Sequence, residues 1–126
     1  LRQLTDAFLD SGFAEDLEVV ALEAPFLSTS GDASVRGRID AVFRDPKDGA
    51  YVLVDWKTAR SEPRTRSTEQ LRYYRTQLRL YQDAWDPRAA DESVPVRAQL
   101  VFVWPQGVRV QTLEEIEAEL AARSEL

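Results

Sequence analysis

The feature that most constrains the fold is a pair of alternating runs joined by a short polar segment. The runs occupy residues 35–44 and 50–58, and residues 45–49 read Asp-Pro-Lys-Asp-Gly. Proline, aspartate and glycine favour turns, so the pattern predicts a β-hairpin. Because side chains alternate between the two faces of a strand, one face of the second run carries Asp55 and Lys57 as neighbours.

An acidic residue of the first run is expected to meet that face. If the turn closes symmetrically, Arg44 pairs with Ala50. Asp40 then lies beside Val54 or Asp55, within one residue of register. Two carboxylates therefore converge near the end of an otherwise apolar strand, where they repel each other and lose hydration.

A hard cation would resolve this repulsion. Magnesium prefers oxygen ligands, usually one or two carboxylates with waters and phosphate, and Asp40 and Asp55 could supply them. Lys57 would then orient or deprotonate a water, or stabilise the negative charge of a phosphoryl transition state. The alternative is a solvated ion pair of Asp55 and Lys57 on an edge strand, because an Asp-x-Lys tripeptide alone occurs widely by chance.

The first run has one face that we expect to pack in the core. That face carries Val35, Gly37, Ile39, Ala41 and Phe43. Asp40 then lies among arginines on the open face, which carries Arg36, Arg38, Asp40, Val42 and Arg44. This face is either an ion-paired outer surface or the wall of a cleft that meets phosphate.

Three short motifs follow one another in the chain. They read Gly-Arg-Ile-Asp at 37–40, Asp-Trp-Lys-Thr at 55–58 and Gln-Leu-Arg-Leu-Tyr at 77–81, within a match that covers residues 23–85. Together they resemble the PD-(D/E)XK nuclease superfamily in its RecB-like exonuclease branch, and three ordered motifs are more specific than one. The resemblance implies an α/β fold with a restriction-endonuclease-like central mixed β-sheet flanked by helices.

The resemblance also implies roles for particular residues. Asp40 and Asp55 match the metal-binding acids of the family, and Lys57 matches its catalytic lysine. Gln77 and Tyr81 match the helix motif beside the site. From helical periodicity alone, Tyr81 would simply be the polar-tipped end of an apolar stripe.

Two further metal ligands are candidates through the same resemblance. They are the main-chain carbonyl of Trp56 and the side chain of Glu23, which resembles an acidic residue on the preceding strand. The implied cofactor is Mg²⁺ or Mn²⁺. The chain has no cysteine, which excludes an iron–sulfur cluster ligated by cysteines.

One departure from the family pattern concerns histidine. Members of this branch usually carry a metal-binding histidine upstream of the first strand, and this chain has none. Either the histidine lies before Leu1 or the site is degenerate. The chain also has no methionine, so we expect residues 1–126 to be a single nuclease-like domain, a C-terminal fragment of a longer protein.

The composition is that of one globular domain. Of the 126 residues, 44% are hydrophobic and 30% are charged, and no run is long enough to span a bilayer. Residues 1–13 are too polar for a secretory signal, so we expect no membrane partner. The absence of cysteine suits a cytoplasmic protein.

The charge is unevenly distributed, although the net charge is -6. Residues 57–79 hold seven basic residues against two acidic ones, whereas the remainder holds nine basic and twenty acidic ones. A DNA backbone would lie along such a strip. An arginine-rich helix surface without a ligand is an equal alternative. The candidate DNA-binding residues are Arg60, Arg64, Arg66, Arg72 and Arg75.

The remaining pattern predicts elements around the hairpin. Residues 1–13 have helical spacing, residues 16–23 form a strand that is interior, and residues 25–32 form a polar connection. Ser67 with Gln70 forms a capping box for a helix that continues to about Trp85.

Downstream of that helix, the dipeptide 86–87 (Asp-Pro) is expected to end it. Residues 96–104 then form a buried strand, which a crossover helix places parallel to residues 50–58. A short strand at 108–110 and an acidic helix at 113–123, capped by Thr112 with Glu115, complete the chain.

Three functions are weighed against one another. The first is a magnesium-dependent DNA exonuclease or endonuclease domain of a bacterial helicase–nuclease, which acts on single strands or duplex ends during DNA end processing and double-strand break repair. Its helicase would lie in the same polypeptide or complex. The second is a catalytically inactive nuclease-fold domain that binds DNA or serves as a scaffold. The third is an interaction domain that uses the acidic C-terminal helix.

Overall fold

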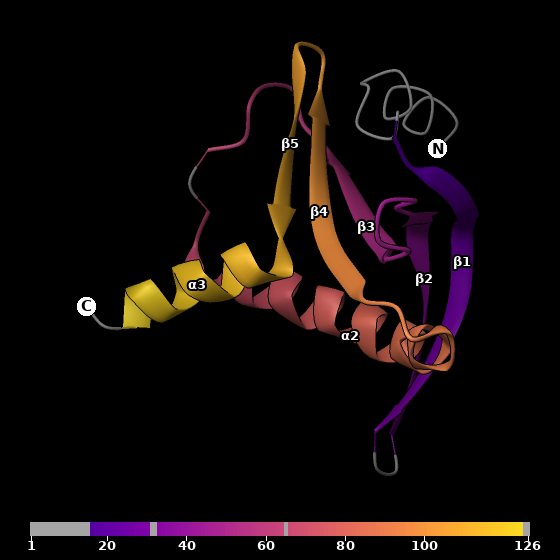
Figure 1. Cartoon of the computed structure of the whole chain (residues 1–126). Helices are drawn as coiled ribbons and strands as arrows, with labels where there is room; N and C mark the ends of the chain where they lie inside the picture. Colours follow the sequence, from indigo (N-terminus) through magenta and orange to yellow (C-terminus); the bar gives the residue numbers. More distant parts are fainter. Residues whose placement is uncertain (1–15, 31–32, 65, 125–126) are drawn as a thin grey trace.

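The computed structural model describes residues 16–30, 33–64 and 66–124 (Figure 1). The helix predicted at residues 1–13 lies outside this part of the chain. The described elements are β1 (Glu18–Ser30), β2 (Ala33–Arg44), β3 (Tyr51–Thr58), α2 (Thr68–Glu92), β4 (Val96–Trp104), β5 (Gly107–Thr112) and α3 (Leu113–Ser124).

Five of these elements form a mixed sheet in the order β1-β2-β3-β4-β5. Neighbouring strands are antiparallel except β3 and β4, which are parallel and are linked by α2. A parallel pair needs a crossover connection, and the helix supplies it. The mixed sheet with helices, expected from the resemblance, is confirmed.

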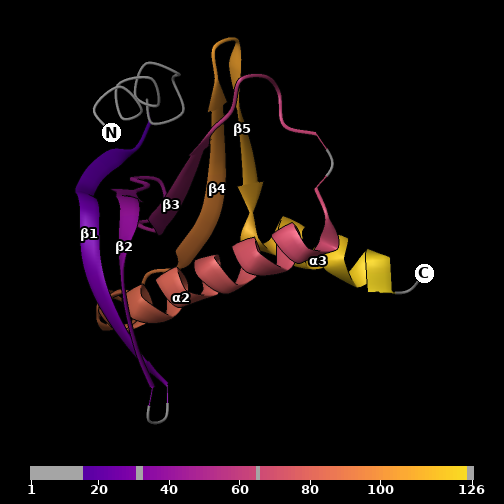
Figure 2. The ribbon, with the colours of Figure 1, turned by 180° about the vertical axis from the view of Figure 1, so that it is seen from behind.

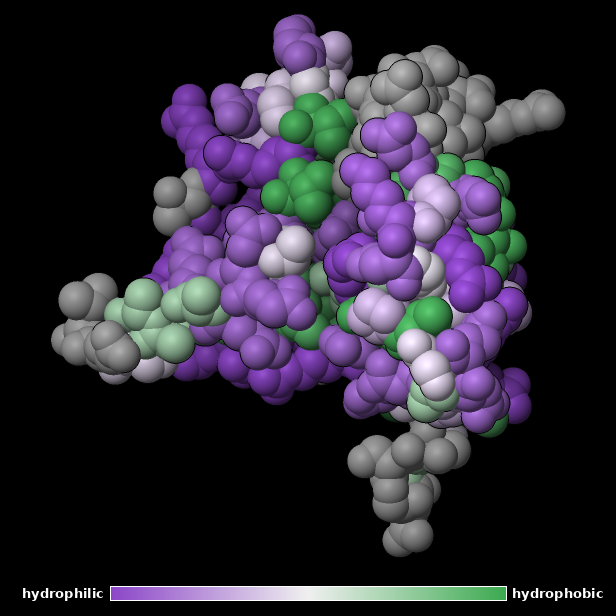
Figure 3. All heavy atoms as spheres, viewed as in Figure 1, coloured by the Kyte–Doolittle hydropathy of each residue, from purple (hydrophilic) through white to green (hydrophobic). Residues whose placement is uncertain are grey.

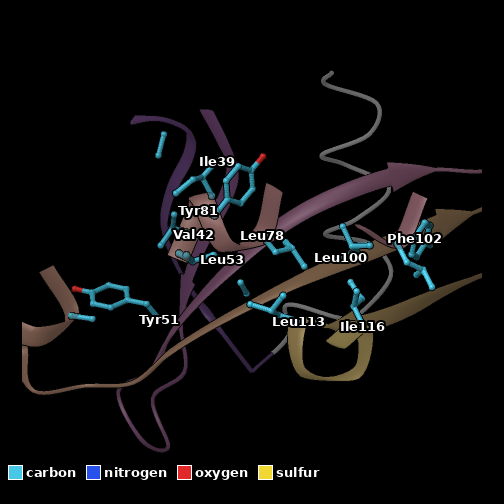
Figure 4. Close-up of a cluster of buried hydrophobic side chains, with 14 of the residues drawn as sticks. Ile39, Val42, Tyr51, Leu53, Leu78, Tyr81, Leu100, Phe102, Leu113 and Ile116 are labelled. Atoms are coloured by element: carbon cyan, nitrogen blue, oxygen red, sulfur yellow. The ribbon is translucent and has the colours of Figure 1, made fainter. Parts of the chain in front are cut away.

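Helices α2 and α3 pack on one face of the sheet. Helix α2 crosses from the β5 side to the β1 side (Figures 1 and 2). The helix-side core joins Leu53 and Leu100 of the sheet with Leu78 of α2 and Ile116 of α3 (Figure 4). The other face is buried too, because Phe43, Val54 and other side chains form a second cluster there.

Burial on both faces corrects one expectation for β2. We expected a core face with Ile39, Ala41 and Phe43 and an open face with Asp40 and Val42. In fact Val42 is fully buried against the helices, whereas Ala41 and Phe43 are buried on the opposite face. Ile39 joins Val42 in the helix-side core, so strict alternation is interrupted around Asp40.

The central hairpin is confirmed, with a register one residue away from the symmetric one. Arg44 pairs with Tyr51 rather than with Ala50. The turn is held by main-chain hydrogen bonds from Asp45 N to Ala50 O (2.9 Å) and from Gly49 N to Asp45 O (2.8 Å). Gly49 has φ +74°, a left-handed conformation that glycine adopts without strain.

Strand β1 differs most from the sequence prediction. It continues to Ser30, so the segment expected to be a polar connection is part of a long hairpin with β2. It is also an edge strand rather than an interior one. Pro25 is compatible with this position because an edge strand tolerates a residue without an N–H group. The register shifts between Val19 and Ala21.

Helix α2 begins as predicted and ends later. Ser67 accepts a hydrogen bond from Gln70 N at 3.1 Å, which completes the expected capping box. The helix continues through Pro87 to Glu92, so the prediction that residues 86–87 end it was wrong. Ala89 is buried beyond the proline, and its tertiary packing opposes the local helix-breaking tendency.

The C-terminal elements agree with the prediction. Strand β4 is central and buried, β5 pairs with it, and α3 begins after a reciprocal cap. Thr112 N donates to Glu115 Oε1 at 3.0 Å, and Glu115 N donates to Thr112 Oγ1 at 3.1 Å. The face seen in Figure 3 is mainly hydrophilic, with separate hydrophobic patches. Neither described helix has both the length and the hydrophobicity required to traverse a membrane.

Candidate active site

The candidate site lies where the β2–β3 ladder ends. Four pairs hold the two strands together, from Arg44 with Tyr51 to Ala41 with Val54. Beyond the last pair, β2 stays paired with β1 and β3 stays paired with β4, so the sheet divides into two branches. The next residues outward along β2 and β3 are Asp40 and Asp55. Both carboxylates therefore lie at the fork.

A side chain links the strands at the fork. The Trp56 N–H group donates to Asp40 Oδ2 at 3.0 Å. This contact fixes the carboxyl of Asp40 against β3. It also brings that carboxyl close to Asp55, and the two interact directly. The expected convergence of residues 40 and 55 is therefore what the structure contains.

Asp55 is the more deeply buried of the pair, with 3% of its surface exposed. Its Oδ2 atom is buried and accepts no hydrogen bond from the described residues. The ammonium group of Lys57 lies 3.3 Å from this atom as an ion pair. A buried carboxylate oxygen with a single positively charged neighbour retains capacity for a further positive ligand.

The electrostatic effect of this arrangement is a shift in the pKa of Asp40. Burial raises the pKa of Asp40, the hydrogen bond and charge of Asp55 act in the same direction, and the net result is a pKa of about 7. The Trp56 N–H group and the Lys57 charge act in the opposite direction, because each favours the ionised carboxylate. The described residues thus leave the acidic pair incompletely compensated.

Lys57 is held between an acid and an aromatic ring. Its Nζ atom lies 5.4 Å from the centre of the Tyr74 ring on α2, in addition to its contact with Asp55. About a third of the lysine side chain remains exposed. The amine can therefore reach both the acidic pair and a group that approaches from solvent.

Helix α2 brings Tyr81 and Gln77 to the site. Tyr81 is buried, and burial raises the pKa of its hydroxyl, with smaller contributions from the negative charges of Asp55 and Asp40. The neighbouring side chain of Gln77 acts in the opposite direction and lowers the pKa of this hydroxyl. Figure 4 shows the Tyr81 ring beside Ile39, the residue that precedes Asp40. The helix motif therefore lies next to the two acids.

Glu23 is placed differently. Its neighbours in β1 pair with Ile39 and Ala41, so its main chain runs across from Asp40. Its side chain is exposed, and its φ is +50°. No group of three acidic, histidine or cysteine side chains that could hold a metal forms within residues 16–30, 33–64 and 66–124. Glu23 therefore does not join the two aspartates, and the role of the Trp56 carbonyl stays a prediction.

The predicted basic strip is divided by the fold. Arg60, Arg64 and Arg72 are exposed, and Arg75 is partly exposed. Arg66 instead turns inward. Its guanidinium lies 3.8 Å from the centre of the Phe102 ring and donates to Gln111 Oε1 at 2.9 Å, and burial lowers its pKa.

Two residues near the site were not singled out from the sequence. Tyr74 has the helical spacing of an apolar stripe with Leu71, Leu78 and Tyr81, yet its ring lies under Lys57. Tyr73 lies outside that stripe and is 64% exposed. Its position outside the stripe could have indicated a functional role from the sequence, because an aromatic side chain there does not pack in the core.

The donor set fits a divalent cation. Two carboxylates converge, one of their oxygens is buried without a hydrogen bond from the described residues, and burial together with Asp55 raises the pKa of Asp40. Magnesium typically uses one or two carboxylates and completes its octahedron with water and phosphate oxygens. Asp40 and Asp55 are the residues that would hold it.

Comparison with known proteins adds the family. Among solved structures, the crystal structure of SSO0001 has 18% identity and a TM-score of 0.49 over 98% of this chain. Pyrococcus furiosus SfsA in complex with Ca²⁺ has 16% identity and a TM-score of 0.33 over 88% of this chain. This chain spans 55% and 62% of their respective lengths. No curated protein matches it.

The family model described as "PD-(D/E)XK nuclease superfamily" matches residues 1–125. This match covers nearly the whole sequence, including both strands of the fork and the helix beside it. The chain therefore belongs to the PD-(D/E)XK nuclease superfamily.

Proposed function

We propose that this chain is the catalytic domain of a metal-dependent deoxyribonuclease, which hydrolyses phosphodiester bonds in DNA with Mg²⁺ or Mn²⁺. The observation that carries the proposal is the meeting of Asp40 and Asp55 at the fork of the sheet, with the Lys57 amine 3.3 Å from Asp55. Membership of the nuclease superfamily supports the same activity.

Each residue has a distinct task in this proposal. Asp40 and Asp55 hold the cation, which when bound supplies Lewis acidity and lowers the pKa of a water ligand. Lys57 positions the attacking water and stabilises negative charge that develops on the phosphate oxygens. Tyr81 and Gln77 form the wall of the site on the α2 side and exclude water from the buried acid pair.

The wider context is part of the same proposal. We infer a domain of a bacterial helicase–nuclease that processes DNA ends for double-strand break repair, with a helicase in the same polypeptide or complex. The order of the three motifs at 37–40, 55–58 and 77–81 supports this assignment. The compartment would be the cytoplasm.

The decisive experiment compares wild type with Lys57→Ala. Full-length protein is incubated with linear single-stranded or duplex DNA and Mg²⁺, and the release of nucleotides is measured. We expect at least about a hundredfold loss of rate, as for removal of a group that stabilises transition-state charge. Lys47→Ala, in the exposed hairpin turn, is the matched control and should cleave at the wild-type rate.

A second function remains in competition because only two carboxylates meet in the described part of the chain. In a noncatalytic DNA-binding domain, intact DNA would persist with wild type and with Lys57→Ala alike. Binding would be sensitive to salt, independent of metal and weakened by combining Arg72→Glu with Arg75→Glu. Cleavage that depends on both Mg²⁺ and Lys57 would rule this function out.

A further inference from the structure

We propose that the groove between the β1–β2 hairpin and helix α2 binds one nucleobase of single-stranded DNA beside the scissile phosphate. This inference rests on the proposed nuclease function and specifies its substrate. It concerns the pocket next to the acid pair, whose walls come from segments far apart in the sequence.

The groove has a volume of about 310 Å³ and three aromatic walls. Phe26 of β1 and Tyr81 of α2 meet edge to face, with ring centres 5.7 Å apart. Tyr73 lines the groove from the same helix. A base has two apolar faces and a polar edge, so a site of this kind suits it better than a purely polar ligand.

A glycine shapes the floor of the groove. A Cβ atom at Gly37 would lie 2.6 Å from Phe26 Cζ, closer than any real contact of that type. Only glycine therefore lets the Phe26 ring approach β2 this closely. Phe26 and Gly37 both line the groove, so this close contact forms part of its wall.

A polar atom in the groove lacks a partner. Gln77 lines the pocket, and its Oε1 atom is buried without a hydrogen bond from the described residues. A buried amide oxygen in this state is unfavourable unless a ligand supplies a donor. The edges of nucleobases carry both N–H donors and acceptors, so a base in the groove would satisfy the amide.

The rim of the groove carries an exposed aromatic ring and positive charge. Tyr73 keeps 64% of its surface exposed, an arrangement that favours stacking with a planar partner. Arg36 and Arg38 line the same pocket, and neither forms an ion pair within the described residues. Their unpaired charges would attract the phosphates on either side of the base.

The groove and the acid pair share a wall. Tyr81 and Gln77 line the groove, and the negative charges of Asp55 and Asp40 contribute to the raised pKa of Tyr81. Arg38 is two residues from Asp40 on the same strand. A base in the groove thus leaves its own phosphate near the acids. Because a base can enter only when it is unpaired, the geometry selects single strands over intact duplex.

The test measures binding rather than cleavage. The full-length Lys57→Ala protein is titrated into a fluorescent oligothymidylate, and into an abasic strand of the same length, in buffer without divalent ions. We expect the abasic strand to bind about tenfold more weakly, within the range for loss of base–aromatic stacking. Equal affinity for the two strands would overturn the proposal.

Variants locate the effect in the groove. In the same background, Tyr73→Ala should remove most of the preference for the base, and Tyr73→Phe should retain it because the ring is kept. Arg36→Glu with Arg38→Glu should weaken binding to both strands, whereas Arg88→Glu, on an exposed part of α2 remote from the groove, should not. A preference for the base unchanged in Tyr73→Ala would place it elsewhere and overturn the proposal.

The two proposals fail in different ways. A wild-type protein that cleaves no DNA but distinguishes the abasic strand through Tyr73 would refute the nuclease activity and leave the groove assignment intact. A protein that cleaves DNA through Lys57 but binds both strands equally would refute the groove alone.

Discussion

Asp40 lies half-buried against a second carboxylate, and the free energy of unfolding should therefore depend on its ionisation. Its pKa is raised to about 7 in the folded protein, above the ordinary value of 3.8, first by burial and then by Asp55. Between about pH 4 and pH 7 the folded state binds more protons than the unfolded state, so stability falls as the pH rises through this window. Above it the loss is complete.

The prediction at this residue concerns Asp40→Asn without divalent ions. The amide can still accept the hydrogen bond from Trp56 N but carries no charge, so the variant should be more stable than wild type at about pH 8 and should lose that advantage at about pH 4. Urea unfolding in EDTA measures this. Asp91→Asn, on the exposed surface, is the control. A stability difference independent of pH would contradict the assignment.

Ionisation of the acid pair lowers the stability of the protein, whereas metal binding to the same two residues should raise it. A cation held by Asp40 and Asp55 relieves their repulsion, so Mg²⁺ should raise the thermal midpoint of the wild type. At a concentration about 100 times Kd, the stabilisation is about 2.7 kcal/mol. Asp55→Asn should abolish the shift, and Glu114→Gln, exposed on α3, should preserve it. A shift that K⁺ reproduces at equal ionic strength would argue against a specific site.

At the scale of elements, the long β1–β2 hairpin holds one wall of the site against α2. The close approach of Phe26 to Gly37 is a contact between the two strands of this hairpin, and the Phe26 ring in turn packs on Tyr81 of the helix. Gly37 pairs directly with Phe26 in the ladder. The position of the hairpin therefore depends on a residue with no side chain.

We predict that Gly37→Ala destabilises the protein by about 1–3 kcal/mol, because the added methyl group displaces the Phe26 ring. Chemical denaturation measures the loss. Phe26→Leu in the same protein should recover part of it, since a smaller side chain leaves room for the methyl group. Additive losses in the double variant would show that the two residues do not interact as described.

The sequence predicted several elements of the fold because their signals are local. Turn residues at 45–49 determine a hairpin, and the capping box of Ser67 with Gln70 determines where α2 begins. The end of α2 could not be predicted in this way. Pro87 disfavours helix locally, but burial of Ala89 in the helix-side core outweighs it, and that core is formed by segments distant in the sequence.

At the scale of the molecule, the site depends on a sheet that is buried on both faces. Asp55 pairs with Leu100 of β4, and Leu100 is fully buried among the helix-side residues. The central strands thus provide the rigid support on which the acidic pair is held. A cavity in this core should therefore lower the free energy of unfolding of the whole domain, while the charged groups at the fork stay the same.

We predict that Leu100→Ala lowers the free energy of unfolding by about 2–5 kcal/mol, as for large-to-small changes in a closed core. Leu22→Ala is the matched control, because Leu22 is 45% exposed and should change stability by less than about 1 kcal/mol. Chemical denaturation compares the two variants by their midpoints, provided that the dependence of the unfolding free energy on denaturant concentration is the same. Equal effects would mean that the β4 core is less well packed than the structure indicates.

The sequence by itself determined the identity and order of the acidic and basic groups, the hairpin that carries them, and the family. These follow from alternation, turn residues and motif spacing, all of which act over a few residues. Only the tertiary structure decided what surrounds these groups. The β2–β3 ladder stops before Asp40, Arg66 turns inward onto Phe102, and β1 lies at the edge of the sheet. Periodicity gives a side chain its face, whereas the packing of distant elements determines what covers that face.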